Sequence, residues 1–399
     1  DIENFDLGSG NNTFTGDTLN NVVNGNTGFD TLRGGRGNDT LRGGLGRDAH
    51  YGELGNDTLI HDDDEFLGSQ IFDGGDNTDT ILLAGLDNDI VHFLGGDIVR
   101  SIEVLEFDGT PVNLPRGVVL AGDQFGDGFA SNLQVRGNST SNNAQSFSVQ
   151  LGQAVDLDLS NVTFANWSSN DTVTITGRND GNIIASPNAD TTVMGMGGDD
   201  TIISRGGKDI INGGNGSDTA SYAGSGFGIT ADLTSNVGES GNAEGDTYVA
   251  IESLTGSEAN DKLTGNDDAN ILTGRAGADV LSGLGGIDTA SYAGSTTGVI
   301  VNLDIGNGTG AGQLGDAEGD TLHDIENLTG SDQRDQLFGT AGENIIDGAG
   351  GFDVMQGYGG DDTYAVDNSL DAVIEANGEG FDNVFSSVDY EINEAQEIE

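Results

Sequence analysis

Residues Gly25–Ile60 read GNTGFDTLRGGRGNDTLRGGLGRDAHYGELGNDTLI, which is four copies of a nine-residue unit, Gly-x-x-Gly-x-Asp-x-apolar-x. The unit is purest at Gly34–Arg42, GGRGNDTLR. A unit this short cannot bury its apolar residue alone, so each copy must stack on its neighbours. The period therefore predicts a solenoid.

The residue types within one unit predict a metal-binding turn followed by a short strand. Glycines at the first and fourth places allow positive φ and close backbone approach, and they leave main-chain carbonyls facing inward. The Asp at the sixth place adds a carboxylate, which gives an all-oxygen ligand set suited to a hard cation such as calcium. The last three residues, as in Thr40-Leu41-Arg42, form a strand whose middle side chain faces the core.

The composition limits the partners of the chain. Its 13 Lys and Arg stand against 67 Asp and Glu, a formal charge of −54, which argues against nucleic acid and anionic membranes as partners. There is no Cys for a disulfide, and no apolar run is long enough to insert into a membrane. Calcium ions are the expected partner, and we expect the calcium-free chain to be largely unfolded because its stacked carboxylates repel.

The unit recurs in four runs with 22 copies, which cover about half of the 399 residues. The core place, two residues after the sixth, is apolar in every copy except at His50. The sixth-place residues are Glu3, Asn12, Asn21, Asp30, Asp39, Asp48 and Asp57; Asn182, Thr191, Asp200, Asp209 and Asp218; Glu252, Asp261, Asn270, Asp279 and Asp288; and Glu326, Asp335, Asn344, Asp353 and Asp362.

The runs predict an all-β chain in five segments. Run 1 covers 1–82, a metal-poor β-strand region covers 83–181, and three further runs with strand connectors cover 182–251, 252–325 and 326–399. The connectors repeat as well, with DTASYAGS at Asp218 and at Asp288, and their alternating apolar residues predict longer strands that continue the stack. For 83–181 we expect the same parallel architecture, and a separate small β-sandwich is the alternative.

The motifs GGRGNDTLR, GGLGRDAHY, GGNGSDTAS, GGFDVMQ and GGDDTYAVD resemble the RTX (repeats-in-toxin) calcium-binding nonapeptide, GGxGxDxUx with U a large apolar residue. The resemblance implies a parallel β-roll in which two nonapeptides form one coil and several calcium ions lie between turns on the same side. It places Asp30 over Asp48, Asp39 over Asp57, Asp200 over Asp218, Asp261 over Asp279 and Asp335 over Asp353. It also implies type I secretion as an unfolded chain that folds where calcium is abundant.

The candidate metal ligands are the sixth-place aspartates and one from a weaker unit at Gly74–Leu82. Asn12, Asn21, Asn182, Asn270 and Asn344 lack the charge, so we expect their turns to be metal-free. The predicted ligands are Asp30, Asp39, Asp48, Asp57, Asp79, Asp200, Asp209, Asp218, Asp261, Asp279, Asp288, Asp335, Asp353 and Asp362.

Other charged groups have simpler interpretations. The acidic run 62–65 is interpreted as a solvated loop, with another cation site as the alternative. Four of the 13 basic residues lie between Arg33 and Arg47, where local neutralisation of turn carboxylates is expected; a surface glycan or a neighbouring subunit is the alternative. His50 is expected to pack in the core or to tilt toward solvent rather than bind a metal.

No catalytic motif stands out from the repeats. The four histidines are scattered, and neither HExxH nor GxSxG occurs, so we expect no enzyme activity and no catalytic residue. The function predicted is that of a secreted, extracellular, calcium-binding structural or adhesive repeat protein of a cell surface or filament. The alternative is the carboxy-terminal non-catalytic module of a secreted protease, lipase or alginate epimerase. Ice binding would need a flat Thr array, which is absent.

The two ends share the phase of the repeats. The chain opens DIENF and closes EIE, as though another unit followed, and neither end has the polar cap that solenoids need. We therefore expect a piece of a longer tandem chain or a protomer that self-associates end to end.

Overall fold

Each nonapeptide folds into a turn and a three-residue strand. In β6 (Thr40–Arg42) the middle residue, Leu41, is fully buried, while its neighbours face outward. Leu41 pairs in parallel with Val23 on one side and with Leu59 on the other. The partners are 18 residues away, so two nonapeptides make one coil, as the resemblance implied.

The computed structural model describes residues 3–62, 70–84, 90–93, 97–108, 116–125, 128–137, 144–152, 156–304, 309–375 and 380–391. They form two compact units, Asp1–Met194 and Gly195–Glu399. Within the described ranges the only helices are the 3-10 turns η1 (Gly122–Gln124), η2 (Gly241–Ala243) and η3 (Gly315–Ala317). None of these described segments is a helix that could cross a membrane.

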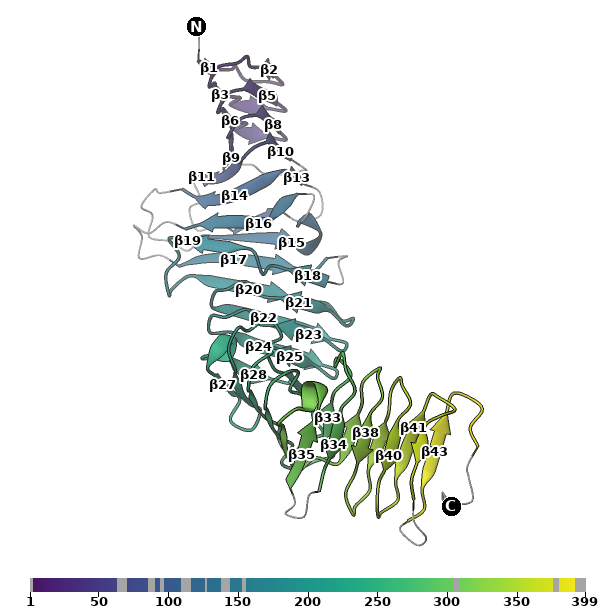
Figure 1. The fold of residues 1–399 in the computed structure, drawn as a ribbon. Helices are drawn as coiled ribbons and strands as arrows, with labels where there is room; N and C mark the ends of the chain where they lie inside the picture. The colour runs from purple at the N-terminus through teal and green to yellow at the C-terminus, as the bar shows by residue number, and fades with distance from the viewer. Residues whose placement is uncertain are drawn as a thin grey trace. The chain divides into compact units, whose positions relative to one another are not determined.

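In the first unit the coils stack through two parallel sheets (Figure 1). The first sheet contains, in order, β1 (Asn4–Asp6), β3 (Val22–Asn24), β6, β9 (Thr58–Asp62), β11 (Thr80–Ala84), β14 (Ile102–Phe107), β16 (Phe129–Arg136) and β19 (Thr163–Ala165). The second contains β13 (Ile98–Arg100), β10 (Ile71–Asp76), β8 (Ala49–Leu54), β5 (Thr31–Arg36) and β2 (Thr13–Thr15), and β4 (Thr27–Gly28) pairs with β7 (Leu45–Gly46).

The middle of the chain continues the parallel stack without the nonapeptide. Its strands are β12 (Ile90–Phe93), β15 (Arg116–Ala121), β17 (Gln145–Gln150), β18 (Asp156–Asp158), β20 (Thr172–Thr176), β21 (Ile183–Ala185) and β22 (Thr191–Gly197). Their described pairings within this unit are all parallel. β14 also pairs in parallel with β11 of run 1. This arrangement overturns the alternative of a separate β-sandwich, since the region extends the sheet of run 1.

The second unit repeats the two-sided coil. One side holds β23 (Thr201–Ile203), β25 (Thr219–Ser221), β29 (Ser253–Thr255), β31 (Ile271–Thr273), β33 (Thr289–Ser291), β37 (Asn327–Thr329), β39 (Ile345–Asp347), β41 (Thr363–Val366) and β43 (Asn383–Ser386). The other holds β24 (Ile210–Asn215), β26 (Thr230–Asp232), β27 (Val237–Glu239), β28 (Thr247–Val249), β30 (Lys262–Thr264), β32 (Val280–Ser282), β34 (Ile300–Asn302), β35 (Thr309–Gln313), β36 (Thr321–His323), β38 (Gln336–Phe338), β40 (Val354–Gln356) and β42 (Ala372–Val373).

The connectors differ from the longer strands that we expected. β26 has three residues and pairs in parallel with β30, but β27 runs antiparallel between β26 and β28. β34, β35 and β36 repeat this arrangement. Each connector is thus a short hairpin inserted into the stack, because its polar segment turns back before the next nonapeptide begins.

A thin core runs along each unit. The core-place residues are buried, including Leu32, Leu41, Leu59, Ile202, Leu263, Leu281, Leu337, Met355 and Tyr364. His50 is buried among them, and its ring stacks on Phe72 with centroids 4.9 Å apart, which confirms the packing predicted for it. The five predicted segments stay a prediction. The boundary between the two compact units, after Met194, lies inside the second predicted run.

Candidate calcium-binding turns

The turn before β6 shows what each glycine does. Gly37, at the fourth place, has φ +110°, which only glycine adopts without strain. Gly34, at the first place, has no such φ; a Cβ there would lie 2.8 Å from the Gly52 carbonyl oxygen of the next coil and would also collide with the Asp39 carboxylate. The first glycine therefore keeps space open rather than supplying positive φ, which corrects the sequence interpretation. The second place also has positive φ, even where it is not glycine, as at Glu53 with φ 75°.

Sixth-place carboxylates of successive coils are joined by hydrogen bonds into a row that we call the Asp ladder. The Asp39 N–H donates to Asp57 Oδ1 at 2.7 Å, and the Asp57 N–H donates to Asp79 Oδ1 at 2.8 Å. The same bond, at 2.7 to 2.8 Å, joins Asp30 to Asp48, Asp200 to Asp218, Asp261 to Asp279 and Asp335 to Asp353. The stacked pairs implied by the resemblance are thus present.

The ladder uses only one oxygen of each carboxylate. For many of these aspartates the other oxygen, Oδ2, is buried and has no hydrogen-bond partner among the described residues. A buried acceptor without a donor costs free energy unless a ligand completes it. These aspartates are Asp30, Asp39, Asp48, Asp57, Asp79, Asp218, Asp279, Asp288, Asp353 and Asp362. All of them belong to units with glycine at the first place.

Burial makes these carboxylates costly as anions. Desolvation, followed by repulsion from neighbouring carboxylates, raises the pKa of Asp57 to about 6, of Asp353 to about 7 and of Asp279 to about 8. Backbone N–H groups of the ladder oppose the rise but do not cancel it. A cation at Oδ2 would supply the missing stabilisation of the charged form.

Three predicted ligands differ from the rest because a serine completes their second oxygen. Ser204 Oγ donates to Asp209 Oδ2 at 3.0 Å. At Asp261 the Oδ2 accepts the Ser257 N–H at 2.5 Å and its hydroxyl at 3.2 Å. Ser331 does the same at Asp335, at 2.6 and 3.1 Å. These three turns already provide donors, whereas the ten aspartates named above have none on Oδ2 among the described residues.

In the asparagine turns the side-chain Oδ1 lies where the aspartates have Oδ2, and it accepts a backbone N–H, from Asn266 to Asn270 at 2.6 Å and from Thr340 to Asn344 at 2.7 Å. The Asn270 N–H donates to Asp288 Oδ1 at 2.7 Å, as in the other ladder steps. Its Nδ2 donates to the Glu252 carbonyl at 3.0 Å, and Asn344 Nδ2 reaches the Glu326 carbonyl in the same way at 2.5 Å. The oxygen that faces the turn is neutral and already has a donor, which agrees with a metal-free turn.

Several ladder members lie outside the nonapeptide spacing. Where a hairpin is inserted, Asp246 and Asp320 continue the ladder from Asp209 and Asp279 across 37 and 41 residues. Their second oxygens accept the hydroxyls of buried tyrosines, as from Tyr292 to Asp320 at 3.0 Å. Other ladder acceptors are Glu103, Glu252, Glu326, Asp371 and Asp382. Glu252, Glu326 and Asp371 have the nonapeptide spacing. The other members could be found only by looking for Asp or Glu before each strand at any interval.

The remaining charged groups form local pairs. Arg33 lies 3.2 Å from Glu53 and over the ring of Tyr51, and Arg42 bonds to Asp62 through two nitrogens at 2.6 and 2.7 Å. These contacts confirm local neutralisation for two of the four arginines. Asp62 belongs to this pair, and residues 63–65 of the acidic run lie outside the described residues.

The open turns fit calcium by the chemistry of their donors. A Cβ at Gly25 would meet Asp30 Oδ2 and, at 2.6 Å, the Gly43 carbonyl oxygen, so the space is lined by oxygens from two successive coils. The donor set is neutral carbonyl and anionic carboxylate oxygen, without nitrogen or sulfur. Hard divalent cations prefer this set, and calcium accepts the larger number of oxygens.

The fold and these turns define a class of protein, the parallel β-roll with calcium-binding nonapeptides. The family model for the RTX calcium-binding nonapeptide repeat, in four copies, matches residues 15–49, 24–59, 188–220, 255–290, 324–355 and 338–368. No curated protein matches the chain. The chain therefore contains several copies of the RTX calcium-binding nonapeptide repeat.

Proposed function

We propose that this chain is a secreted, extracellular structural module whose coils are held together by several calcium ions, with no catalytic role of its own. The observation that carries the proposal is the set of buried Asp oxygens without a donor. Each lies beside a first-place glycine that leaves an oxygen-lined space, as between Gly34 and Asp39. The matched family describes calcium-binding repeats and no catalytic domain.

We further propose that calcium occupies the open turns and not those closed by a serine. Of the 14 predicted ligands, Asp209, Asp261 and Asp335 would then have a ladder role without a calcium ion on Oδ2. The other eleven would be calcium ligands: Asp30, Asp39, Asp48, Asp57, Asp79, Asp200, Asp218, Asp279, Asp288, Asp353 and Asp362.

The free energy contributed by calcium at these turns would be large enough to decide whether the chain folds. Extracellular sites have dissociation constants of about 10⁻⁴ to 10⁻³ M. A tenfold excess of calcium then adds about 1.4 kcal/mol for each site by mass action. Several such sites equal the whole stability of an ordinary domain, which is about 5–15 kcal/mol. The chain would remain unfolded where calcium is scarce, as export through a type I secretion channel requires, and would fold outside.

The structural or adhesive role of a cell-surface or filament component follows from the same geometry. β43 pairs with β41 and has no second described partner in its sheet, and Phe385 in β43 is 68% exposed. An uncovered parallel edge invites a further strand. We propose end-to-end self-association through such edges, with calcium screening the acidic charge. Of the four arginines between Arg33 and Arg47, we propose Arg36 and Arg47 for contact with a surface glycan, since Arg33 and Arg42 pair with Glu53 and Asp62.

The alternative function is a calcium module attached to a secreted enzyme of the protease, lipase or alginate epimerase type. The flanking sequence of the gene distinguishes the two, because an adjoining catalytic domain would favour the enzyme module. Light scattering with and without calcium tests self-association. A mass that stays that of one chain at high concentration in calcium would contradict stacking.

The calcium proposal is tested by equilibrium dialysis and circular dichroism on the full chain. Chelation should abolish the β signal, and Asp39→Ala should lower the number of bound calcium ions. Asp261→Ala is the matched control, since Ser257 already completes that carboxylate, and it should keep the calcium number. A chelated chain with an unchanged spectrum, or equal calcium numbers for wild type and Asp39→Ala, would contradict the proposal.

A further inference from the structure

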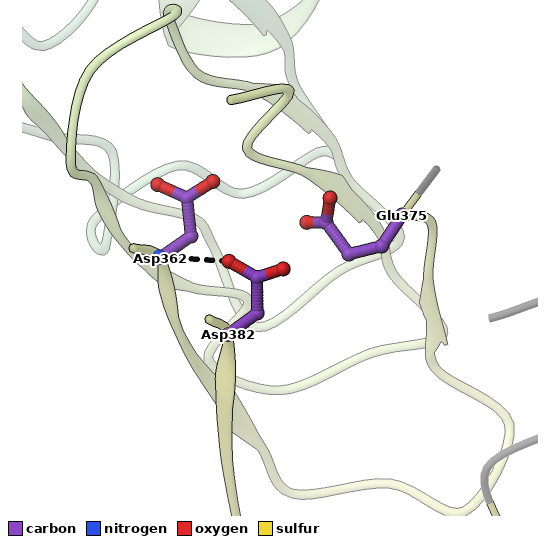
Figure 2. A group of neighbouring side chains, drawn as sticks. All are labelled: Asp362, Glu375 and Asp382. Atoms are coloured by element: carbon purple, nitrogen blue, oxygen red, sulfur yellow. Dashed lines mark hydrogen bonds between the residues drawn. The ribbon is translucent and has the colours of Figure 1, made fainter. Parts of the chain in front are cut away.

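We propose that Asp362, Glu375 and Asp382 form a divalent-cation site of calcium type that differs from the repeat turns by a third carboxylate (Figure 2). Each residue offers one carboxylate oxygen, and these oxygens lie within 4.8 Å of one another. All three side chains are buried. The site rests on the proposed function in one respect, since Asp362 also belongs to an Asp ladder.

Two of the carboxylates come from successive turns. The Asp362 N–H donates to Asp382 Oδ1 at 2.9 Å, so the ladder extends by one more coil, across 20 residues instead of 18. Asp362 Oδ1 accepts the Asn344 N–H at 2.7 Å. Its Oδ2 accepts no hydrogen bond from any described residue, although Asp362 exposes 0% of its surface. A buried anionic oxygen that faces two other carboxylates indicates a missing positive ligand.

The third carboxylate comes from outside the repeats and is held in place by a tyrosine. Tyr364 is the one tyrosine among the 22 core-place residues, and it is fully buried. Its hydroxyl accepts the Gly357 N–H at 2.6 Å and donates to Glu375 Oε1. Glu375 lies two residues beyond β42 and thereby reaches the turn that begins at Gly357.

A comparison with Tyr292 shows that this turn is not closed by its tyrosine. The Tyr292 hydroxyl donates directly to the second oxygen of Asp320 and so completes that carboxylate. The Tyr364 hydroxyl is instead directed to Glu375, which brings a further negative charge toward Asp362. The Tyr292 hydroxyl thus takes the place of a cation at Asp320, whereas the Tyr364 hydroxyl positions Glu375 as a ligand for a cation.

The excess of acidic residues in the surrounding sequence also favours binding of a cation from solution. Residues 335–399 contain sixteen Asp and Glu and no Lys, Arg or His. The segment therefore has no basic side chain of its own to neutralise three buried carboxylates. An all-oxygen set with three negative charges is typical of calcium, which takes 6–8 oxygens and would complete its shell with carbonyls and water.

A cation at this site would fasten the last described coil. Glu375 follows β42, Asp382 precedes β43, and Asp362 precedes β41, which pairs with β43 (Figure 1). The ion would join all three segments at one point. Binding of this ion should therefore stabilise the coil at β43 and leave the stability of run 1 unchanged.

The test combines calcium counting with hydrogen exchange on the full chain. Glu375→Gln keeps the size of the side chain and removes one charge, and exposed Glu391→Gln is the control with the same change of charge. Glu375→Gln should bind one calcium ion fewer at 1 mM calcium or bind its weakest ion about tenfold more weakly. It should also lose the calcium-dependent protection of 380–391, while 25–60 stays protected.

The outcomes separate this site from the proposed function. If wild type binds calcium but Glu375→Gln matches it in calcium number and in protection of 380–391, this site is wrong and the repeat turns stand. If wild type binds no calcium, both proposals fail. Glu375→Asp retains the charge on a shorter side chain and covers the case in which the glutamine variant does not fold. It should weaken the same ion, and unchanged affinity would also overturn the site.

Discussion

Gly34→Ala tests whether the first-place glycine keeps open a cation site. The added Cβ would lie 2.8 Å from the Gly52 carbonyl oxygen and would overlap the Asp39 carboxylate. Gly34 lacks a left-handed φ, so alanine meets no conformational penalty and only the space is changed. The two nearest atoms, Asp39 Oδ2 and the Gly52 carbonyl oxygen, are oxygens of the proposed calcium site.

The expected cost has two parts. Overpacking by one methyl group costs about 1–3 kcal/mol. Loss of one calcium ion at tenfold excess over its dissociation constant costs about 1.4 kcal/mol more. The free energy of unfolding in calcium should therefore fall by about 2–4 kcal/mol.

The two parts are separated by varying the calcium concentration. Each bound ion raises the free energy of unfolding by about 1.4 kcal/mol for a tenfold increase in calcium. Denaturant unfolding at 1 and 10 mM calcium should give Gly34→Ala a dependence smaller by this amount than that of wild type. Gly8→Ala is the control, because no atom lies within 4 Å of its added Cβ. A destabilised Gly34→Ala with the wild-type calcium dependence would refute the reasoning, since the glycine would then serve packing alone.

Two further variants test the core and the closed turns. Leu41→Ala removes a fully buried side chain from the thin core of run 1 and should lower the free energy of unfolding by about 2–5 kcal/mol with an unchanged calcium dependence; a loss below about 1 kcal/mol would show that the coil collapses around the gap. Tyr292→Phe removes the hydroxyl that donates to buried Asp320 and should cost about 1–3 kcal/mol, measured by denaturant unfolding in saturating calcium. A neutral effect at Tyr292 would mean that water or a cation completes Asp320 equally well.

The fold could be predicted from the sequence because the nonapeptide pattern that produces it is periodic. Each unit contributes the same turn and the same inward residue, so Leu32, Leu41 and Leu59 could be placed in the core by counting. The pairing of Asp39 with Asp57 followed from two units per coil. Periodicity failed where residues are inserted. Asp382 lies 20 residues after Asp362, and Asp320 lies 41 after Asp279, so neither could be found by counting in nines.

Whether the second oxygen of each carboxylate has a hydrogen-bond donor could not be predicted from the repeat either. Asp261 and Asp279 have the same place in the unit, but Ser257 donates to the first and no described residue completes the second oxygen of the other. The difference arises from a serine hydroxyl four residues away, which the nonapeptide pattern leaves unspecified. The role of Tyr364 in positioning Glu375 could not be predicted for the same reason. The pattern requires only an apolar core residue, and it does not specify the tyrosine hydroxyl.

The ladder has a direction, and the direction bears on the kinetics of folding. In every step the backbone N–H of an earlier coil donates to a carboxylate of a later one, as from Asp39 to Asp57 and from Asp57 to Asp79. A coil added on the amino-terminal side of a folded segment meets an acceptor already fixed in place, whereas a coil added on the carboxy-terminal side must bring its own carboxylate into position. Growth of the solenoid should therefore be faster toward the amino terminus, with the folded part acting as a template for both the ladder bond and the strand pairing of each new coil.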